Sequence, residues 1–499
     1  MDSTVKVEAG HLRGRQVDGV HAFLGVPFAA PPVGQHRLRP PQPVEPWSGV
    51  REATEIGPAP PQVAPPEGGG SGWDTEAIGD DCLTLNVWTP DPGASGLPVM
   101  VWVQGGMFEF GATAAYDGRH FARDGVVCIV LNWRVGADGF LYLDDGVANL
   151  GLLDQMAALE WVRDNIAAFG GDPDNVTVFG ESAGAMSIGV MLAMPAARGL
   201  FHRAVLQSGA AHQAISANTA ARVGRSLVDR LGVPPRRDDI AALPVERLLL
   251  AQAELKAELL AHPDPDRWGG DLVASMMPWQ PVIDGRTLPG TPIELVTGGS
   301  AAQVDVLAGT NTDEWRLFLA ITGEIDRVTE EDLTGPVGVH GFRTLAAYGL
   351  PVERGLAAYR AHHPGAAPGE LLAAVQTDWW TRVPAIRLAE AHVNLRSGTY
   401  MYEFAWPAPG LGAVHGLEIP FVFDTLGADA PLFGPLVGDT APQGLADTVH
   451  RAWISFATTG DPGWPRYAPD RRATMRFDTD PLVVDDPRAW ERDLWHGIR

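Results

Sequence analysis

The hydrophobic positions of the chain fall into short apolar runs that are separated by longer segments with helical spacing. Each run has the length and β-branched content of a strand that is buried on both faces. The runs that predict strands are PVMVWVQGG from Pro98, VVCIVLNW from Val126, NVTVFG from Asn175, VDVLAGTNTDE from Val304 and TYMYEFAW from Thr399. Because such runs alternate with helical segments, the sequence predicts an α/β fold whose large, mostly parallel central sheet carries helices on both faces.

Apolar residues at helical spacing predict helices over 150–169, 243–261 and 369–394. The last two segments lie within long stretches, around 212–300 and 316–398, that interrupt the series of strands. We expect these stretches to be helical insertions that build a cap over a site.

No internal repeat and no Pro/Ser-rich linker divides the chain, so residues 1–499 are interpreted as a single domain. The clearest low-complexity stretch is PAPPQVAPPEGGGSG at 58–72. Proline removes backbone donors and glycine adds chain entropy, so this stretch predicts a mobile surface loop.

Composition and charge exclude several classes of protein. Apolar residues make up 45% of the chain and charged residues 20%, which is typical of a globular protein. The net charge of −24 would repel phosphate backbones, so no nucleic acid partner is expected. No apolar stretch is long enough for a spanning helix, no signal peptide pattern is present, and Cys82 and Cys128 are the only cysteines. We expect a soluble cytoplasmic protein without membrane association.

The strongest chemical signal is GESAG at 180–184, between a predicted strand and a predicted helix. This G-x-S-x-G pattern in a strand–turn–helix context exposes a nucleophilic serine. The sharp turn strains the serine backbone, and the flanking glycines prevent clashes with neighbouring chains. The helix N-terminus then lies near the anion that forms in acyl transfer. The pattern favours Ser182 as a nucleophile over an ordinary glycine turn.

A serine hydroxyl needs a base that a carboxylate orients, and in this architecture the chain order is Ser, then Asp or Glu, then His. Of the fourteen histidines, His415 follows the predicted strand over 399–406 and a Pro-Gly loop, where a base would reach the serine. A surface histidine is the alternative at this position. Asp313 and Glu314 both end a predicted strand, and the pattern leaves open which of them points inward, or whether both are solvated.

The sequence QGGMF at 104–108 ends the predicted strand that begins at Pro98. Acyl transfer needs backbone N–H groups that point at the developing oxyanion, and glycines let a loop bring them close. The N–H of Ala183, directly after the serine, would supply a further donor. This loop therefore predicts an oxyanion hole.

Together with further motifs in the same order, these features resemble the type-B carboxylesterase family, the cholinesterase-like branch of the α/β-hydrolases, and within it the bacterial para-nitrobenzyl-esterase-like members. The resemblance covers nearly the whole chain and implies the α/β-hydrolase fold and a serine carboxylic-ester hydrolase with an acyl-enzyme intermediate. The matching segments are FLGVPFA at 23–29, DCLTLNV at 81–87, NWRVG at 132–136, NLGLLDQ at 149–155, FGGDP at 169–173, FGESAG at 179–184, FHRA at 201–204 and LQSG at 206–209.

The resemblance also implies roles for individual residues. The family's acid is the glutamate of a G-x-x-x-D-E segment, which implies Glu314. Its base lies in an H-G-x-E-I segment, which implies His415. The implied oxyanion donors are Gly106, Met107 and Ala183.

The chain departs from the family pattern at several positions. Gln104 stands where the family often has histidine, and we expect it to tune the rate. Met107 stands where the family has glycine or alanine, so its side chain is expected to crowd the acyl pocket. Pro60 replaces a cysteine that bridges to position 82 in many secreted relatives, so Cys82 is expected to be unpaired, as in a reducing compartment. We expect no membrane anchor and no oligomerising tail.

Aromatic residues near the triad segments predict a pocket for apolar or aromatic esters. Glu181, beside the nucleophile, would either add negative charge to the site or form a structural salt bridge. The expected pocket residues are Phe108, Glu181, Trp315, Phe318, Trp379, Trp380 and Phe421.

The predicted chemistry requires neither a metal nor an organic cofactor, and no His, Cys and carboxylate cluster with metal-ligand spacing occurs in the sequence. The expected partner is a small-molecule ester, with the chain as a monomer or homodimer. Two alternatives remain open: a non-catalytic cholinesterase-like binding module, and an amidase or transacylase that uses the same triad.

Overall fold

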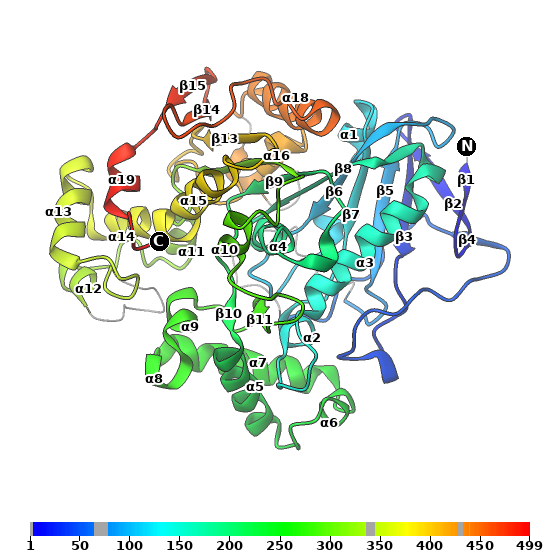
Figure 1. The fold of residues 1–499 in the computed structure, drawn as a ribbon, viewed down its shortest axis with the longest axis horizontal. Coiled ribbons are helices and arrows are strands. Elements are labelled where there is room, and N and C mark those ends of the chain that lie inside the picture. The colour runs from blue at the N-terminus through cyan, green and yellow to red at the C-terminus, as the bar shows by residue number, and fades with distance from the viewer. Residues whose placement is uncertain (1–2, 64–77, 336–344, 428–432, 439) are drawn as a thin grey trace.

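A large mixed β-sheet runs through the structure, a computed structural model that describes residues 3–63, 78–335, 345–427, 433–438 and 440–499 (Figure 1). Its strands are β1 (Ser3–Val7), β2 (Gly10–Val17), β3 (Val20–Pro27), β4 (Val50–Glu52), β5 (Thr84–Thr89), β6 (Leu97–Val103), β7 (Val127–Leu131), β8 (Gly171–Glu181), β9 (Arg203–Gln207), β12 (Asp305–Asn311), β13 (Thr399–Phe404), β14 (Ala473–Phe477) and β15 (Leu482–Asp485). They lie side by side in the order β1-β2-β3-β5-β7-β6-β8-β9-β12-β13-β14-β15, and β4 pairs with β2.

Parallel pairing dominates the middle of the sheet. Every neighbouring pair from β7 through β6, β8, β9, β12 and β13 to β14 is parallel, whereas the strands from β1 to β5 and the β14–β15 pair are joined mainly by antiparallel ladders. The five predicted apolar runs form β6, β7, β8, β12 and β13. The prediction of a mostly parallel α/β sheet is confirmed, and the antiparallel strands before β5 are an addition that hydrophobic periodicity did not predict.

Helices follow most of the parallel strands. They are α1 (Arg119–Arg123), α2 (Gly136–Phe140), α3 (Leu150–Asn165), α4 (Ala183–Met191), α5 (Ala217–Leu231), α6 (Arg237–Ala241), α7 (Val245–Ala261), α8 (Pro265–Trp268), α9 (Gly270–Ser275), α10 (Pro292–Thr297), α11 (Arg316–Ile321), α12 (Glu330–Thr334), α13 (Val352–His362), α14 (Pro368–Thr377), α15 (Val383–His392), α16 (Ile419–Val422), α17 (Gly434–Val437), α18 (Gln443–Thr459) and α19 (Ala489–Leu494). A π-helical turn, Asp378–Arg382, joins α14 to α15. A small second sheet pairs β10 (Ile215–Ser216) with β11 (Val282–Ile283).

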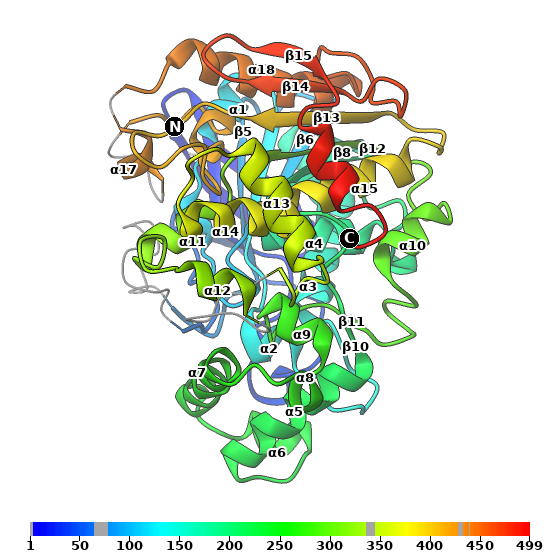
Figure 2. The ribbon, with the colours of Figure 1, turned by 90° about the vertical axis from the view of Figure 1, so that its left-hand side faces the viewer.

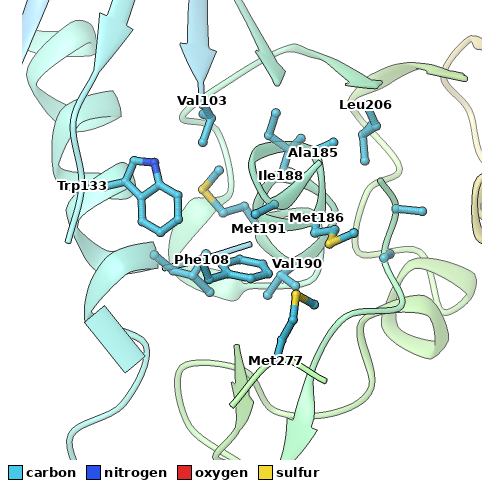
Figure 3. Packing of buried hydrophobic residues seen from close by; sticks show 14 of the residues in the cluster. Val103, Phe108, Trp133, Ala185, Met186, Ile188, Val190, Met191, Leu206 and Met277 are labelled. Carbon is cyan, nitrogen blue, oxygen red and sulfur yellow. The ribbon is translucent and has the colours of Figure 1, made fainter. Parts of the chain in front are cut away.

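The side chains of β6 alternate between two hydrophobic cores, because successive residues of a strand point to opposite faces. Val99, Val101 and Val103 pack in the core that α3 and α4 cover, whereas Met100 and Trp102 pack in the core that α1 and α18 cover. Figure 3 shows the first of these cores around α4. The predicted helices on both faces of the sheet are therefore present.

The two long stretches between strands are helical. Residues 212–300 contain α5 to α10, and residues 316–398 contain α11 to α15. In Figure 1 the group α5–α9 lies below the sheet, and α12–α14 lie at its left-hand side. Their interpretation as insertions into one domain stays a prediction. In the described part of the chain, no helix is both long and apolar enough to cross a membrane.

The predicted surface loop at 58–72 lies partly outside the described residues. Its first part is not a surface loop, because Ala59 and Gln62 are buried. The Gln62 amide donates to the Gly111 carbonyl at 3.1 Å and accepts from the Gly111 N–H at 2.7 Å. The prediction is therefore wrong for residues 59–62, where a glutamine side chain satisfies the backbone next to the 104–108 loop.

Candidate active site

Ser182 occupies the sharp turn between β8 and α4, with φ 54° and ψ −123°. A positive φ is strained for a residue with a side chain. Its N–H donates to the Gln207 carbonyl at 2.9 Å, and its carbonyl accepts from Met186 at 2.8 Å. A Cβ atom at Gly184 would lie 1.9 Å from the Val103 carbonyl oxygen, so only glycine fits where the helix meets β6. This crowding is the physical basis of the G-x-S-x-G pattern.

His415 and Glu314 meet because they follow adjacent parallel strands, β13 and β12. The imidazole Nδ1 and Glu314 Oε2 are 2.6 Å apart. In addition, the backbone N–H of His415 donates to the backbone carbonyl of Glu314 at 3.2 Å. The other carboxylate oxygen of Glu314 accepts from the Asn311 N–H at 2.8 Å. The backbone thus holds the fully buried carboxylate in place, and the carboxylate can hold the imidazole in the tautomer with a proton on Nδ1.

Asp313, the other candidate acid, has different partners. Its Oδ2 accepts from the Ala413 N–H at 3.0 Å and from the Thr312 hydroxyl at 2.8 Å. Asp313 therefore ties down the loop that carries His415, and Glu314 is the carboxylate that contacts the ring.

A second carboxylate faces the other side of the imidazole. His415 Nε2 lies 2.9 Å from Glu181 Oε1, although the pair lacks the alignment of a hydrogen bond. Among the described residues, no hydrogen bond joins the Ser182 hydroxyl to His415. Burial alone would lower the pKa of His415, but Glu181 and Glu314 raise it well above its ordinary value. Burial raises the pKa of Glu181, and the nearby imidazole only partly opposes this shift.

Buried polar side chains contact the segments that carry Glu314 and His415. Glu418 accepts from the Gln207 amide at 3.1 Å and from the Asn311 amide at 2.6 Å. Asn311 also donates to the Val414 carbonyl at 2.7 Å, next to His415. Burial, with Glu181 and Glu314 nearby, raises the pKa of Glu418 to about 8. Within the described ranges, no group of three or more His, Cys, Asp or Glu is placed to hold a metal ion.

The 104–108 loop bends through consecutive positive φ angles: 115° at Gly106, 55° at Met107 and 62° at Phe108. A Cβ at Gly106 would lie 1.9 Å from the Phe110 carbonyl oxygen. In the described part of the chain, the N–H groups of Gly106, Met107 and Ala183 take part in no hydrogen bond. These N–H groups therefore remain available to an oxyanion near Ser182.

A cavity of about 250 Å³ is lined by both Ser182 and His415. Of the predicted pocket residues, Trp315, Phe318 and Trp380 line it. Trp315 and Trp380 stack with ring centroids 4.7 Å apart. Most of the other lining side chains are apolar, so the cavity suits an apolar group.

The other four predicted pocket residues do not line this cavity. Glu181 contacts His415, and Trp379 stacks with Tyr348 instead. Phe108 and Phe421 are fully buried in the two cores on opposite faces of the sheet. Proximity along the chain was a poor guide here, because neighbouring residues of a strand, helix or turn point in different directions.

Sequence reasoning missed part of the cavity wall. Met107 was expected to crowd the site and does line the cavity, but Met186, Met276 and Met277 line it as well. Met186 lies four residues after Ser182 on α4, so helical spacing could have indicated it. Met276 and Met277 come from the segment after α9, and no local pattern connects them with the nucleophile.

One cation, Lys256 of α7, also lines the cavity. Its ammonium pairs with the carboxylate of Glu109, which follows the 104–108 loop. This pair joins the α7 helix to the segment that follows the 104–108 loop. The sequence offered no signal for it, because 147 residues separate the two partners.

Comparisons with known proteins identify the family of the chain. The model of the carboxylesterase family matches residues 1–495. The chain is 36% identical to the para-nitrobenzyl esterase of Bacillus subtilis (strain 168), over 98% of this chain and 97% of that protein. It is 34% identical to the phenmedipham hydrolase of Pseudarthrobacter oxydans, over 97% and 96% of the two chains.

A solved structure supports the assignment of the chain to the carboxylesterase family. The crystal structure of a carboxylesterase from Geobacillus stearothermophilus superposes with a TM-score of 0.84 at 37% identity, and the match covers 99% of both chains. These findings confirm the resemblance and the α/β-hydrolase fold. The chain belongs to the carboxylesterase family, the hydrolases of carboxylic esters.

Proposed function

We propose that the protein hydrolyses carboxylic esters through an acyl-enzyme, with Ser182 as nucleophile, His415 as general base and acid, and Glu314 as the carboxylate that orients the imidazole. The observation that carries this proposal is the 2.6 Å contact between His415 Nδ1 and Glu314 Oε2, beside a cavity that Ser182 and His415 share. The strained backbone of Ser182 at a helix N-terminus supports it further.

In the proposed reaction, Ser182 Oγ attacks the ester carbonyl while His415 Nε2 takes its proton. The N–H groups of Gly106, Met107 and Ala183 stabilise the oxyanion. His415 then protonates the leaving alcohol as the C–O bond breaks. In the second half, His415 takes a proton from water as the water oxygen attacks the acyl carbonyl. The bond between the acyl carbon and Ser182 Oγ then breaks, His415 returns the proton to Oγ, and the acid leaves.

The reaction requires His415 Nε2 to turn from Glu181 toward Ser182 when a substrate binds. Catalytic hydrogen bonds are often long or poorly aligned in a free enzyme and shorten in the complex. Glu181 then lies beside the imidazolium that forms during the attack and stabilises its charge.

The size and lining of the cavity favour substrates that are esters with an apolar or aromatic group. Its volume of about 250 Å³ and its wall of Trp315, Phe318 and Trp380 suit a group of the size of a benzyl ring or a medium alkyl chain. The name of one relative, para-nitrobenzyl esterase, points to the same class. Amide hydrolysis and acyl transfer to an alcohol use the same triad and remain alternatives.

We further propose a cytoplasmic location and a monomer or homodimer. Both Cys82 and Cys128 are buried and unpaired, as expected for a reducing compartment. Burial raises the pKa of the Cys82 thiol, so this thiol is a poor nucleophile. The net charge of −24 makes nucleic acid an unfavourable partner.

The test is hydrolysis of p-nitrophenyl esters from acetate to decanoate by the wild type, Ser182→Ala and a control, Ser187→Ala. Ser187 lies on the same helix and accepts a hydrogen bond from the Gln155 amide, outside the cavity lining. We expect Ser182→Ala to lose at least about a thousandfold in kcat, because no other hydroxyl replaces the nucleophile. Ser187→Ala should stay within about threefold of the wild type.

Equal activity of the wild type and Ser182→Ala would overturn the assignment of the nucleophile. If the wild type is folded but hydrolyses none of the esters, the result would instead favour the non-catalytic binding module. Anilide substrates added to the same assay separate the amidase alternative, and added alcohols reveal acyl transfer.

A further inference from the structure

The π-helical turn Asp378–Arg382 carries part of the cavity wall. Trp380 and Thr381 line the cavity, whereas Trp379 does not. The rings of Trp379 and Trp380 meet edge to face, with centroids 5.1 Å apart and planes at 81°. A π turn inside a helix is rare and is found mostly at functional sites. Any shift of Trp379 therefore changes the place of Trp380 in the wall.

From Trp380, ring contacts continue to the catalytic base. Trp380 stacks on Trp315 at 4.7 Å and 14°. Trp315 contacts Phe318 at 4.7 Å, and Phe318 contacts the His415 ring at 5.2 Å. The wall is thus one packed row of rings that begins at the π turn and ends at the imidazole.

On its other side, the π turn is held by Arg499. The guanidinium lies 4.0 Å from the centroid of the Trp379 ring. Its Nε donates to the Trp379 carbonyl at 3.2 Å, and its Nη2 donates to Gln213 Oε1 at 2.9 Å. No carboxylate forms an ion pair with Arg499 among the described residues. Burial lowers the pKa of Arg499 to about 10, so the side chain remains a cation at neutral pH.

Two residues near the C-terminal end of the chain interact with the two ends of the π turn, one directly and one through Tyr359. Glu491 of α19 pairs with Arg382 at 2.8 Å. Trp495 donates to the Tyr359 hydroxyl at 2.8 Å, and Tyr359 in turn donates to Asp378. Figures 1 and 2 both show α19 beside α13 and the C-terminal end of the chain near α14 and α15. This segment therefore packs against the π turn, and none of its residues lines the cavity.

We propose that Arg499 is a positioning residue for the substrate pocket: its cation stacks on Trp379 and donates to the Trp379 carbonyl, and this contact holds Trp380 in place against the larger apolar group of the ester. The inference rests on the proposed esterase function. It assigns a specificity role to a side chain that touches neither the substrate nor the triad. A substrate with a large apolar group needs the intact wall, whereas a small ester needs only the triad and the oxyanion hole.

The test uses Arg499→Met, which keeps the length and apolar bulk of the side chain but removes the cation and its hydrogen bonds. Arg492→Met is the matched control, because Arg492 lies on α19 but pairs with Asp486 and Asp493. Arg499→Lys keeps a cation over the ring and loses the planar fork, so it should restore part of the effect. KM and kcat are measured in two ester series, one with a growing acyl group and one with a growing alcohol group.

We expect the KM of Arg499→Met to rise by about fivefold for the largest ester of one series, while its kcat and its KM for the smallest ester stay within about twofold. Arg492→Met should follow the wild type. A uniform change across both series, or no change, would overturn the positioning role.

If Arg499→Met does not fold, as thermal unfolding would reveal, Trp379→Phe replaces it, because a smaller ring offers Arg499 less surface. The same size-dependent rise in KM is expected, and its absence overturns the inference. Failure of the esterase proposal is distinguishable: it would leave the wild type inactive on every ester, whereas failure of this inference leaves an active wild type and an unchanged size preference.

Discussion

Ser182 has a φ of 54° and a ψ of −123°, a conformation that costs a residue with a side chain about 1–3 kcal/mol. Hydrogen bonds to Gln207 and Met186 hold it there, and the fit of Gly184 against the Val103 carbonyl makes the turn possible. Backbone crowding therefore requires glycine at position 184, and a local sequence pattern was enough to predict the sharp turn at Ser182.

Glu181→Gln tests how the second carboxylate sets the protonation of His415. The imidazole must be neutral to act as base, so kcat/KM rises as the pH passes upward through the pKa of His415. Glu181 and Glu314 raise that pKa against the effect of burial, and loss of one negative charge must lower it. We expect the acid limb of the kcat/KM profile to move to lower pH.

The control is Glu160→Gln, because Glu160 is an exposed carboxylate on α3. This substitution should leave the kcat/KM profile unchanged. A limb that stays in place in Glu181→Gln, or moves to higher pH, would contradict the role of Glu181.

At the level of elements, the site exists because β8, β12 and β13 are parallel and end at the same edge of the sheet. The loops after their carboxyl ends carry Ser182, Glu314 and His415, as expected for ligand sites in open α/β sheets. Periodicity predicted these buried strands well. It missed strands such as β4, whose residues are all exposed and whose place depends on pairing with β2.

A buried ion pair ties the segment after β7 to α3, and it can be tested by substitution. Arg134 donates twice to Asp154, at 2.8 Å and 2.7 Å, and both side chains are almost fully buried. Arg134→Met leaves the buried Asp154 carboxylate without its cationic partner, although the backbone N–H of residue 134 still donates to it. We expect the free energy of unfolding to fall by about 3 kcal/mol or more in chemical denaturation.

Arg163→Met supplies the comparison on α3, because its pair with Asp164 is exposed. It should change stability by less than about 1 kcal/mol. Equal effects of the two substitutions would show that burial is not what makes the Arg134 pair important.

The π turn is a feature that the spacing of apolar residues did not predict. The spacing over 369–394 predicted one helix, and α14 and α15 do cover that segment. The extra residue of a π turn changes the direction of every side chain that follows. Which of the adjacent residues Trp379 and Trp380 faces the cavity therefore depends on the turn and its packing against α19, whereas proximity to the triad segments in the sequence pointed to both.

At the scale of the whole molecule, the net charge of −24 creates a negative field that draws cations toward the protein. We expect kcat/KM for a choline ester to fall by about threefold between about 10 mM and about 0.5 M salt, because salt screens the field. The neutral dimethylbutyl analogue of that ester, measured in parallel, should change little. Parallel changes for both esters would show that salt acts on the enzyme itself rather than on the encounter.

The sequence by itself determined the α/β fold, and it predicted the turn at Ser182 and the loop at 104–108 as catalytic elements, because each is a constraint on backbone within a few residues and leaves a local pattern. Spacing left Asp313 and Glu314 open, the family resemblance implied Glu314, and the structure shows that Glu314 contacts His415. Only the tertiary structure decided that Glu181 faces Nε2. It also decided that Met276 and Arg499 belong to the pocket and its support. These contacts join residues far apart in the chain, so they depend on how the strands and helices pack, which no local pattern records.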